Sequence, residues 1–130
     1  MSIVTDVAPA AAAQVLAHFE ASLAFETDCW DVHHALSTGA HDFVLLDVRG
    51  SEKFARGHVP GALDLAHAKI IASKLAEFPE TTVFVTYCAG PHCNGAARAA
   101  IRLARLGRPV KIMAGGYIGW MDEGFPLERG

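Results

Sequence analysis

Cysteine is scarce in this 130-residue sequence. The three cysteines, Cys29, Cys88 and Cys93, are an odd number in a chain long enough to build a hydrophobic core. This argues against a scaffold held together by disulfides and favours a reducing compartment. The N-terminus also lacks the Lys and Arg of a signal peptide, and its alanine-rich stretch, residues 8–17, is too short to span a membrane. We therefore expect a cytoplasmic protein that makes no membrane contact.

Charged residues are also few, and basic residues form no dense patch. Charged side chains make up 19% of the chain and hydrophobic ones 52%, which is typical of a globular protein and not of a disordered one. The formal net charge is −3. The one basic cluster, Arg98, Arg102, Arg105 and Arg108, has helical spacing and predicts the solvated face of a helix. The sequence therefore predicts no nucleic-acid partner.

Helix and strand patterns alternate along the whole chain. Strands are expected at residues 23–26, 43–46, 83–86 and 110–113, and helices from Pro9 onward and at residues 28–37, 51–56, 67–78, 94–106 and 115–122. This alternation predicts an α/β fold with a mainly parallel central sheet and helices on both faces. No linker interrupts the pattern, so a single domain over residues 1–130 is expected.

Two helix starts have specific signals. Pro9 suits the first turn of a helix, and that helix carries an apolar stripe of Val15, Leu16, Phe19 and Leu23. Asp28 is a suitable N-cap, with Asp31 placed for a capping box.

Cys88 lies where the predicted strand 83–86 ends and a loop leads into the predicted helix 94–106. In an open α/β sheet this junction is the usual ligand crevice. The amides of a tight loop and the positive end of the following helix favour the thiolate, which is the reactive form of cysteine. A buried structural cysteine is the alternative. We predict that Cys88 is a catalytic nucleophile.

The loop after Cys88 supplies the candidate substrate-binding residues. Backbone amides of Ala89, Gly90 and Asn94 are expected to surround the sulfur, whereas Pro91 has no N–H to offer.

His92 and Cys93 each allow two interpretations. His92 is a candidate cation for an anionic donor or a solvent-facing loop residue. Cys93 is a candidate to resolve an oxidised or persulfidated Cys88 by forming a disulfide, or a small residue at the helix start. We expect its side chain to point away from Cys88 in the reduced protein. The spacing of Cys88, His92 and Cys93 does not match the paired spacing of zinc ligands, so no metal and no cofactor are predicted.

Several sequence blocks together resemble the rhodanese-like domain family. They are LLDVR at residues 45–49 with Phe54, GHVPGA at residues 57–62, Tyr87-Cys88 at a strand end, and GGYIGW at residues 115–120. The blocks occur in the family's order over most of the chain. The resemblance implies a rhodanese fold, a Cys88 persulfide, and sulfur transfer from a small-molecule donor such as thiosulfate to a thiol, cyanide or a protein acceptor. The loop after Cys88 departs from the family pattern because it is longer and carries no Arg or Lys.

The same resemblance implies that Asp47 and Arg49 support the active-site region, with Arg49 exposed near the crevice as a substrate-binding residue. A single ion pair between these two residues, or a capped turn, is the alternative. His58 is expected to be a structural histidine bonded to the backbone. A non-catalytic or redox-sensing binding module is the alternative function. A phosphatase or arsenate reductase is less favoured, because the sixth residue after Cys88 is Asn94 where a phosphatase needs an arginine.

Overall fold

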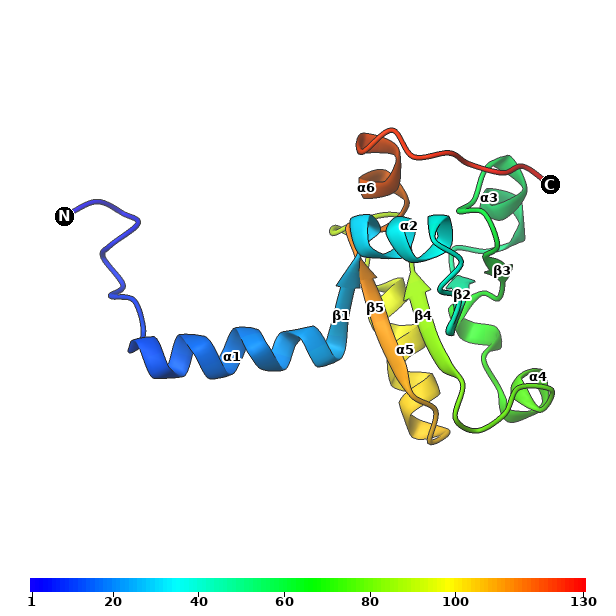
Figure 1. The fold of residues 1–130 in the computed structure, drawn as a ribbon, viewed down its shortest axis with the longest axis horizontal. Coiled ribbons are helices and arrows are strands. Elements are labelled where there is room, and N and C mark those ends of the chain that lie inside the picture. The colour runs from blue at the N-terminus through cyan, green and yellow to red at the C-terminus, as the bar shows by residue number, and fades with distance from the viewer.

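The computed structural model describes residues 1–130 as a five-stranded parallel sheet flanked by helices, with one helix extending from its edge (Figure 1). The strands are β1 (Glu26–Asp28), β2 (Phe43–Asp47), β3 (Leu63–Asp64), β4 (Val83–Tyr87) and β5 (Val110–Ala114). The helices are α1 (Ala12–Phe25), α2 (Cys29–Ser37), α3 (Ser51–Arg56), α4 (Ala72–Leu75), α5 (Gly95–Arg105) and α6 (Gly116–Asp122), with a 3-10 helix, η1, at His67–Lys69.

The sheet has the strand order β1-β5-β4-β2-β3, and every neighbouring pair is parallel. The central strand β4 pairs with β2 from Phe43 opposite Val83 to Asp47 opposite Tyr87. The carboxyl ends of β2 and β4 therefore lie side by side, which is the edge where α/β proteins bind ligands. This confirms the predicted α/β class with a parallel sheet.

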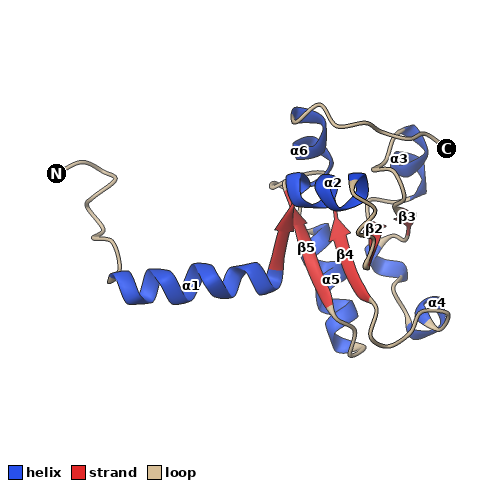
Figure 2. Cartoon of the chain, in the orientation of Figure 1, coloured by secondary structure: helices blue, strands red, loops and turns tan.

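Hydrophobic residues from the two faces of the sheet form two separate cores. Val85 and Tyr87 of β4 pack with residues of α2 and α6 on one face, whereas Phe84 packs with residues of α5 on the other. Figure 2 shows the helices placed around the strands. Alternate residues of each strand are buried on opposite faces, which explains why the predicted strand at residues 43–46 reads as a continuous apolar run.

Most predicted elements are confirmed, and three predictions need correction. The helix Ser51–Arg56 matches its predicted bounds, and Asp28 caps α2 by accepting a 2.8 Å hydrogen bond from the Asp31 amide. The short strand predicted at residues 23–26 lies instead at Glu26–Asp28, because α1 continues to Phe25. The single helix predicted at residues 67–78 is instead the short pair η1 and α4, and the strand β3 was not predicted. Strand β3 has only two residues, too few to show the period of a strand.

Helix α1 extends away from the sheet, and none of its residues is buried (Figure 1). It begins at Ala12, three residues after the predicted start at Pro9. The predicted apolar stripe is present but faces solvent, with Phe19 62% and Leu23 68% exposed. No helix of the structure is both long and apolar enough to cross a membrane.

Candidate active site

Cys88 follows the last residue of the central strand β4 and is 7% exposed. Its side chain packs in the core on the α5 face of the sheet, beside Ala96 of α5. The Thr86 hydroxyl donates a 3.0 Å hydrogen bond to the Ala96 carbonyl, which fixes the start of α5 against the strand. Strand β4 and helix α5 therefore hold Cys88 at the carboxyl edge of the sheet, as the sequence predicts.

A disulfide joins Cys88 to Cys93 within the loop. The Cys93 amide donates a 3.0 Å hydrogen bond to the Gly90 carbonyl, and the turn that this bond closes brings the two α-carbons to 6.4 Å. The expectation that the Cys93 side chain points away from Cys88 concerns the reduced protein, so this disulfide-bonded state leaves it a prediction.

Backbone amides in the first turn of α5 lie beside the two sulfur atoms. The Gly95 amide lies 3.4 Å from Cys93 Sγ. The amides of Ala96 and Ala97 donate to no backbone carbonyl, because the groups four residues earlier lie in the loop. Such a helix start carries partial positive charge and favours anions, including a thiolate or a persulfide.

A cavity of about 360 Å³ lies beside this loop. Cys88, Cys93, Ala96 and Ala97 contribute to its wall together with Gly116 of α6. Its size suits a small molecule. The cavity therefore brings together the sulfur atoms and the helix start that could hold an anion.

The loop is tied to the start of α6 by two backbone hydrogen bonds. Tyr117 and Ile118 donate to the carbonyls of Cys88 and Ala89 at 2.9 and 2.8 Å. Gly116 makes this close approach possible: it has a φ of +61°, and a Cβ there would lie 2.6 Å from the Cys88 carbonyl oxygen. The GGYIGW block therefore supports the reactive loop.

Asp47 and Arg49 form a buried ion pair directly beside this loop. The Arg49 guanidinium donates to both Asp47 carboxylate oxygens, at 3.0 Å from Nε and 2.6 Å from Nη2, and also to the Gly57 carbonyl at 2.6 Å. Tyr87 donates its hydroxyl proton to Asp47 at 2.7 Å. Burial and the charge of Asp47 raise the pKa of Tyr87, so this hydroxyl remains a donor.

The predicted exposure of Arg49 is wrong. Its side chain is 6% exposed, is engaged by Asp47, and packs 4.0 Å over the Tyr117 ring. An ion pair with Asp47 is the alternative that the sequence left open, and the structure contains it. Asp47 and His58, the two residues predicted to support the structure, are both buried, and His58 Nδ1 lies 2.9 Å from the Phe54 carbonyl.

His92 and Asn94 lie on the exposed side of the loop. The His92 ring packs against Gly90, where a Cβ would lie 3.3 Å from Nδ1. The Asn94 side chain accepts a 3.1 Å hydrogen bond from Arg98 Nε. Arg98 is therefore a permanent cation attached to the loop, which sequence reasoning missed because it counted only residues up to Asn94. The structure contains no group of three His, Cys, Asp or Glu residues placed to hold a metal ion.

The start of α6 at Gly115 and Gly116 separates Cys29 from this site. Cys29 lies in the core on the α2 face, and its thiol donates toward the Gly116 carbonyl at 3.4 Å. Burial, together with the nearby charges of Asp28 and Glu123, raises the pKa of Cys29 to about 11. Cys29 is therefore a thiol at neutral pH and a poor nucleophile.

The raised pKa of Cys29 predicts a loss of stability in alkaline solution. A folded-state pKa above the unfolded value favours the protonated form, so stability is retained below about pH 9 and falls as the pH rises toward 11. Chemical denaturation across this range should show the fall, and Cys29→Ala should reduce it. An equally steep fall in Cys29→Ala would contradict the assignment.

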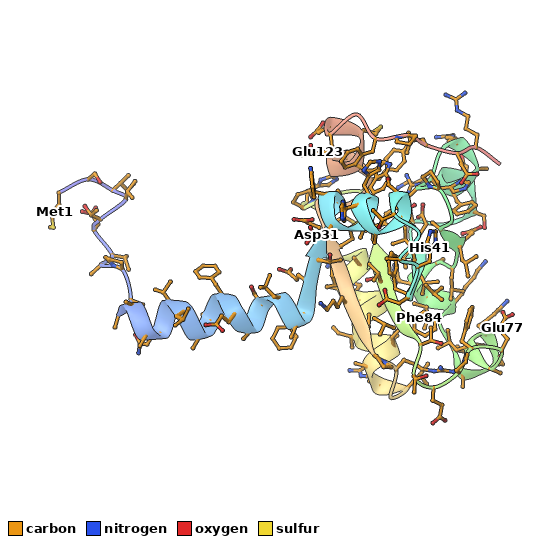
Figure 3. The ribbon with its side chains drawn as sticks, viewed as in Figure 1. Met1, Asp31, His41, Glu77, Phe84 and Glu123 are labelled. Atoms are coloured by element: carbon orange, nitrogen blue, oxygen red, sulfur yellow. A yellow bond between two sulfur atoms is a disulfide. The ribbon has the colours of Figure 1, made fainter.

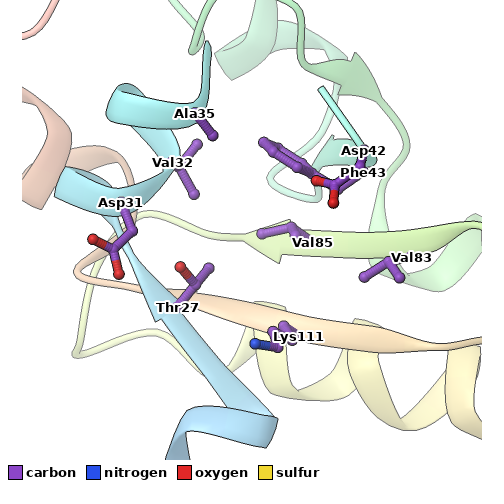
Figure 4. Close-up of a pocket in the computed structure, with 9 residues that line it drawn as sticks. All are labelled: Thr27, Asp31, Val32, Ala35, Asp42, Phe43, Val83, Val85 and Lys111. Carbon is purple, nitrogen blue, oxygen red and sulfur yellow. The ribbon is translucent and has the colours of Figure 1, made fainter. Parts of the chain in front are cut away.

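A second cavity, of about 310 Å³, lies on the other face of the sheet between α2 and the strands (Figure 4). Thr27, Asp31, Val32, Ala35, Asp42, Phe43, Val83, Val85 and Lys111 line it. None of these side chains is a cysteine, serine or histidine, so the cavity lacks the nucleophile that the Cys88 cavity has.

The family assignment follows from the match of the rhodanese-like domain model to residues 31–123. The chain belongs to the rhodanese-like domain family, whose fold it has. The matched region includes the Asp47–Arg49 pair, Cys88 with its loop, and the support from α6.

The relatives of this chain have names that refer to different functions. The HTH-type transcriptional regulator Rv0324 of Mycobacterium tuberculosis is 38% identical over 70% of this chain, but the chain spans only 40% of that relative's length. Thiosulfate sulfurtransferase 16 of Arabidopsis thaliana, a chloroplastic protein, is 31% identical over 70% of this chain and 88% of its own length. The chain is therefore related to sulfurtransferases as well as to a regulator.

Among solved structures, the BH2092 protein of Bacillus halodurans has the same fold, with a TM-score of 0.86 and 33% identity. The match covers 89% of this chain and 85% of that chain. Residues 26–130 alone make up a smaller share of this chain than the matched 89%. The match therefore also includes part of the segment before β1, which contains α1.

Proposed function

We propose that this protein is a sulfurtransferase that moves a sulfane sulfur from a small anionic donor such as thiosulfate to a thiol or cyanide acceptor. The observation that carries the proposal is the position of Cys88 at the end of the central strand, beside a cavity and the free amides of Ala96 and Ala97. A thiolate there can attack the outer sulfur of the donor, and the persulfide that results is an anion stabilised by the helix start.

Reduction of the Cys88–Cys93 disulfide precedes this chemistry, because only a free thiolate is nucleophilic. We therefore place the reaction in a reducing compartment such as the cytoplasm. Ala89, Gly90 and Asn94 bring further backbone amides to the loop, and Arg98 brings a permanent positive charge. The similarity to thiosulfate sulfurtransferase 16 of Arabidopsis supports the same sulfurtransferase activity.

Loading with sulfur tests the proposal. The reduced protein should release sulfite from thiosulfate, and Cys88→Ser should release none, because serine cannot accept the sulfane sulfur. Sulfite assay and intact-protein mass spectrometry measure this, with Cys29→Ala as the control that behaves as the native protein does. Sulfite release by Cys88→Ser at the native rate would exclude Cys88 as the nucleophile.

A redox-sensing binding module is the second candidate, and the Cys88–Cys93 disulfide favours it. In that case the reduced protein would release no sulfite from thiosulfate, but its affinity for a partner would change with oxidation. The loading experiment separates the two functions.

His92 gives a separate test of charge at the loop. Because the residue is exposed beside Gly90, His92→Arg should lower the KM for thiosulfate by about fivefold, as a surface charge interaction worth about 1 kcal/mol would. Steady-state kinetics measures this. With an uncharged thiosulfonate ester as donor the KM should not change. An equal change with both donors would show that charge is not the cause.

A further inference from the structure

We propose that Cys93 is an internal acceptor which releases the transferred sulfur as sulfide, so that the protein also acts as a dithiol-dependent reductase of sulfane sulfur. The inference rests on the proposed function, since it begins from a Cys88 persulfide. The observation behind it is that the loop brings Cys93 into bonding contact with Cys88. The turn closed by the 3.0 Å hydrogen bond from Cys93 to Gly90 holds the two residues together.

The reaction balances in three steps. The Cys88 thiolate attacks the outer sulfur of thiosulfate, and sulfite leaves with the electron pair of the broken bond. The Cys93 thiolate then attacks Cys88 Sγ, the bond to the outer sulfur breaks, and that sulfur leaves as hydrosulfide. The sulfane sulfur has gained two electrons and the two cysteines have lost them as the disulfide. A dithiol reductant finally restores both thiols by thiol–disulfide exchange.

Proximity favours this internal step over attack by an external thiol. A nucleophile held in the same loop replaces a bimolecular encounter with an intramolecular one. The Gly95 amide, 3.4 Å from Cys93 Sγ, also favours the Cys93 thiolate. Cys29 cannot take this role, because it lies on the other face of the sheet and its pKa is about 11.

The disulfide is also arranged for reduction. Cys93 is partly exposed and Cys88 is buried, so an incoming dithiol reaches Cys93 first. Attack on Cys93 Sγ makes Cys88 the leaving group, and the start of α5 stabilises the departing thiolate. The reductant therefore regenerates Cys88 in the form that the next donor needs.

A single turnover without reductant or oxygen tests the proposal. The protein is first reduced, freed of reductant, and mixed with one equivalent of thiosulfate. The native protein should release one sulfite and one sulfide, and its mass should fall by two hydrogen atoms. Cys93→Ser should stop at the persulfide, with sulfite released, no sulfide, and the mass of one sulfur atom gained. Cys29→Ala is the control and should match the native protein.

The outcomes separate this inference from the proposed function. A native protein that releases sulfite but keeps the added sulfur overturns the role of Cys93 and leaves the sulfurtransferase intact. A native protein that releases no sulfite overturns both. Sulfide release by Cys93→Ser equal to the native yield would also overturn the internal acceptor.

The exposed helix α1 carries an independent second proposal: we infer that it pairs with α1 of a second copy of this chain. At about 100° per residue, Val15, Leu16, Phe19 and Leu23 fall on one face of the helix. Each is exposed, and Figure 3 shows the side chains of α1 standing clear of the sheet. An isolated helix of 14 residues is marginal in water, so its apolar face needs a partner.

The connection between α1 and the sheet excludes folding back onto the same chain. Helix α1 ends at Phe25 and β1 begins at Glu26, so there is no loop to allow a reversal. Lys111 of β5 donates a 2.8 Å hydrogen bond to the Leu23 carbonyl and fixes the direction of the helix. The α/β unit of the same chain therefore does not cover the apolar face.

A second copy complements the polar edges of this face. In an antiparallel pair centred on Phe19, Val15 lies opposite Leu23 of the other copy, and His18 lies opposite Glu20. An imidazole donor and a carboxylate acceptor then face each other on both sides of the apolar seam. A lipid surface fits less well, because α1 has no Lys or Arg to attract anionic headgroups.

Sedimentation velocity of the full chain tests the pairing. The native protein should sediment as a dimer, and Phe19→Glu as a monomer with unchanged far-ultraviolet circular dichroism of the α/β unit. Ala17→Glu, which places the same charge on the opposite face of α1, should remain a dimer. A monomeric native protein would overturn the proposal, as would a monomer that co-sediments with vesicles of phosphatidylcholine and phosphatidylglycerol.

Discussion

Asp47→Ala is expected to lower the free energy of unfolding by about 3–5 kcal/mol, because it leaves the Arg49 guanidinium buried without its counter-charge. The Asp47 side chain is fully buried and holds both Arg49 and the Tyr87 hydroxyl. Chemical denaturation measures the loss. Arg49 has no other acidic partner to replace Asp47, and its remaining acceptor with a short contact is the Gly57 carbonyl.

A double variant serves as the matched control. Asp47→Leu combined with Arg49→Met removes both charges and should recover part of the loss, since apolar residues of similar size often replace a buried pair at little cost. Tyr87→Phe should cost about 2 kcal/mol, because it removes two buried hydrogen bonds, the one donated to Asp47 and the one accepted from the Val59 amide. If Asp47→Ala were no more harmful than Tyr87→Phe, the ion pair would not stabilise the fold.

Gly95→Ala is expected to lower the sulfur-transfer rate by about 10²-fold while the protein still folds. A Cβ at Gly95 would lie 2.7 Å from Cys88 Sγ, so the sulfur atom must move. A displacement of about 1 Å can cost a factor of about 10² in rate. Gly95 is buried, so the crowding should also cost about 1–3 kcal/mol of stability and lower the temperature of thermal unfolding.

Kinetics with saturating thiosulfate and a fixed acceptor measures this effect. Gly95→Ser should behave in the same way, because its Cβ occupies the same position. A Gly95→Ala protein with native turnover would show that Cys88 Sγ is free to shift, and that the close fit of α5 does not position it.

The sequence predicted the features that depend on local pattern. The parallel sheet followed from apolar strands that alternate with helices, and the position of Cys88 followed from the strand before it and the helix after it. The capped start of α2 at Asp28 was visible because a cap depends on residues only three positions apart. Such signals need no knowledge of distant contacts.

The features that the sequence did not reveal depend on long-range contacts or on exact loop geometry. The stripe of α1 has the period of a buried face, but period alone does not say which surface covers it. Arg49 faces its Asp47 partner instead of the crevice because the pair is closed by Tyr87 and Gly57, which lie elsewhere in the sequence. The approach of Cys93 to Cys88 depends on one turn at Gly90, which residue types do not specify.

The burial of Cys29 beside the start of α6 limits how the protein can be oxidised. Three thiols permit three different intramolecular pairings. Gly115 and Gly116 at the start of α6 lie between Cys29 and the loop of the other two cysteines, so the folded chain has only the Cys88–Cys93 pairing within reach. Oxidative mispairing then requires α6 to move first, which makes the packing of α6, and not the reactivity of the sulfur atoms, the safeguard of the reactive loop.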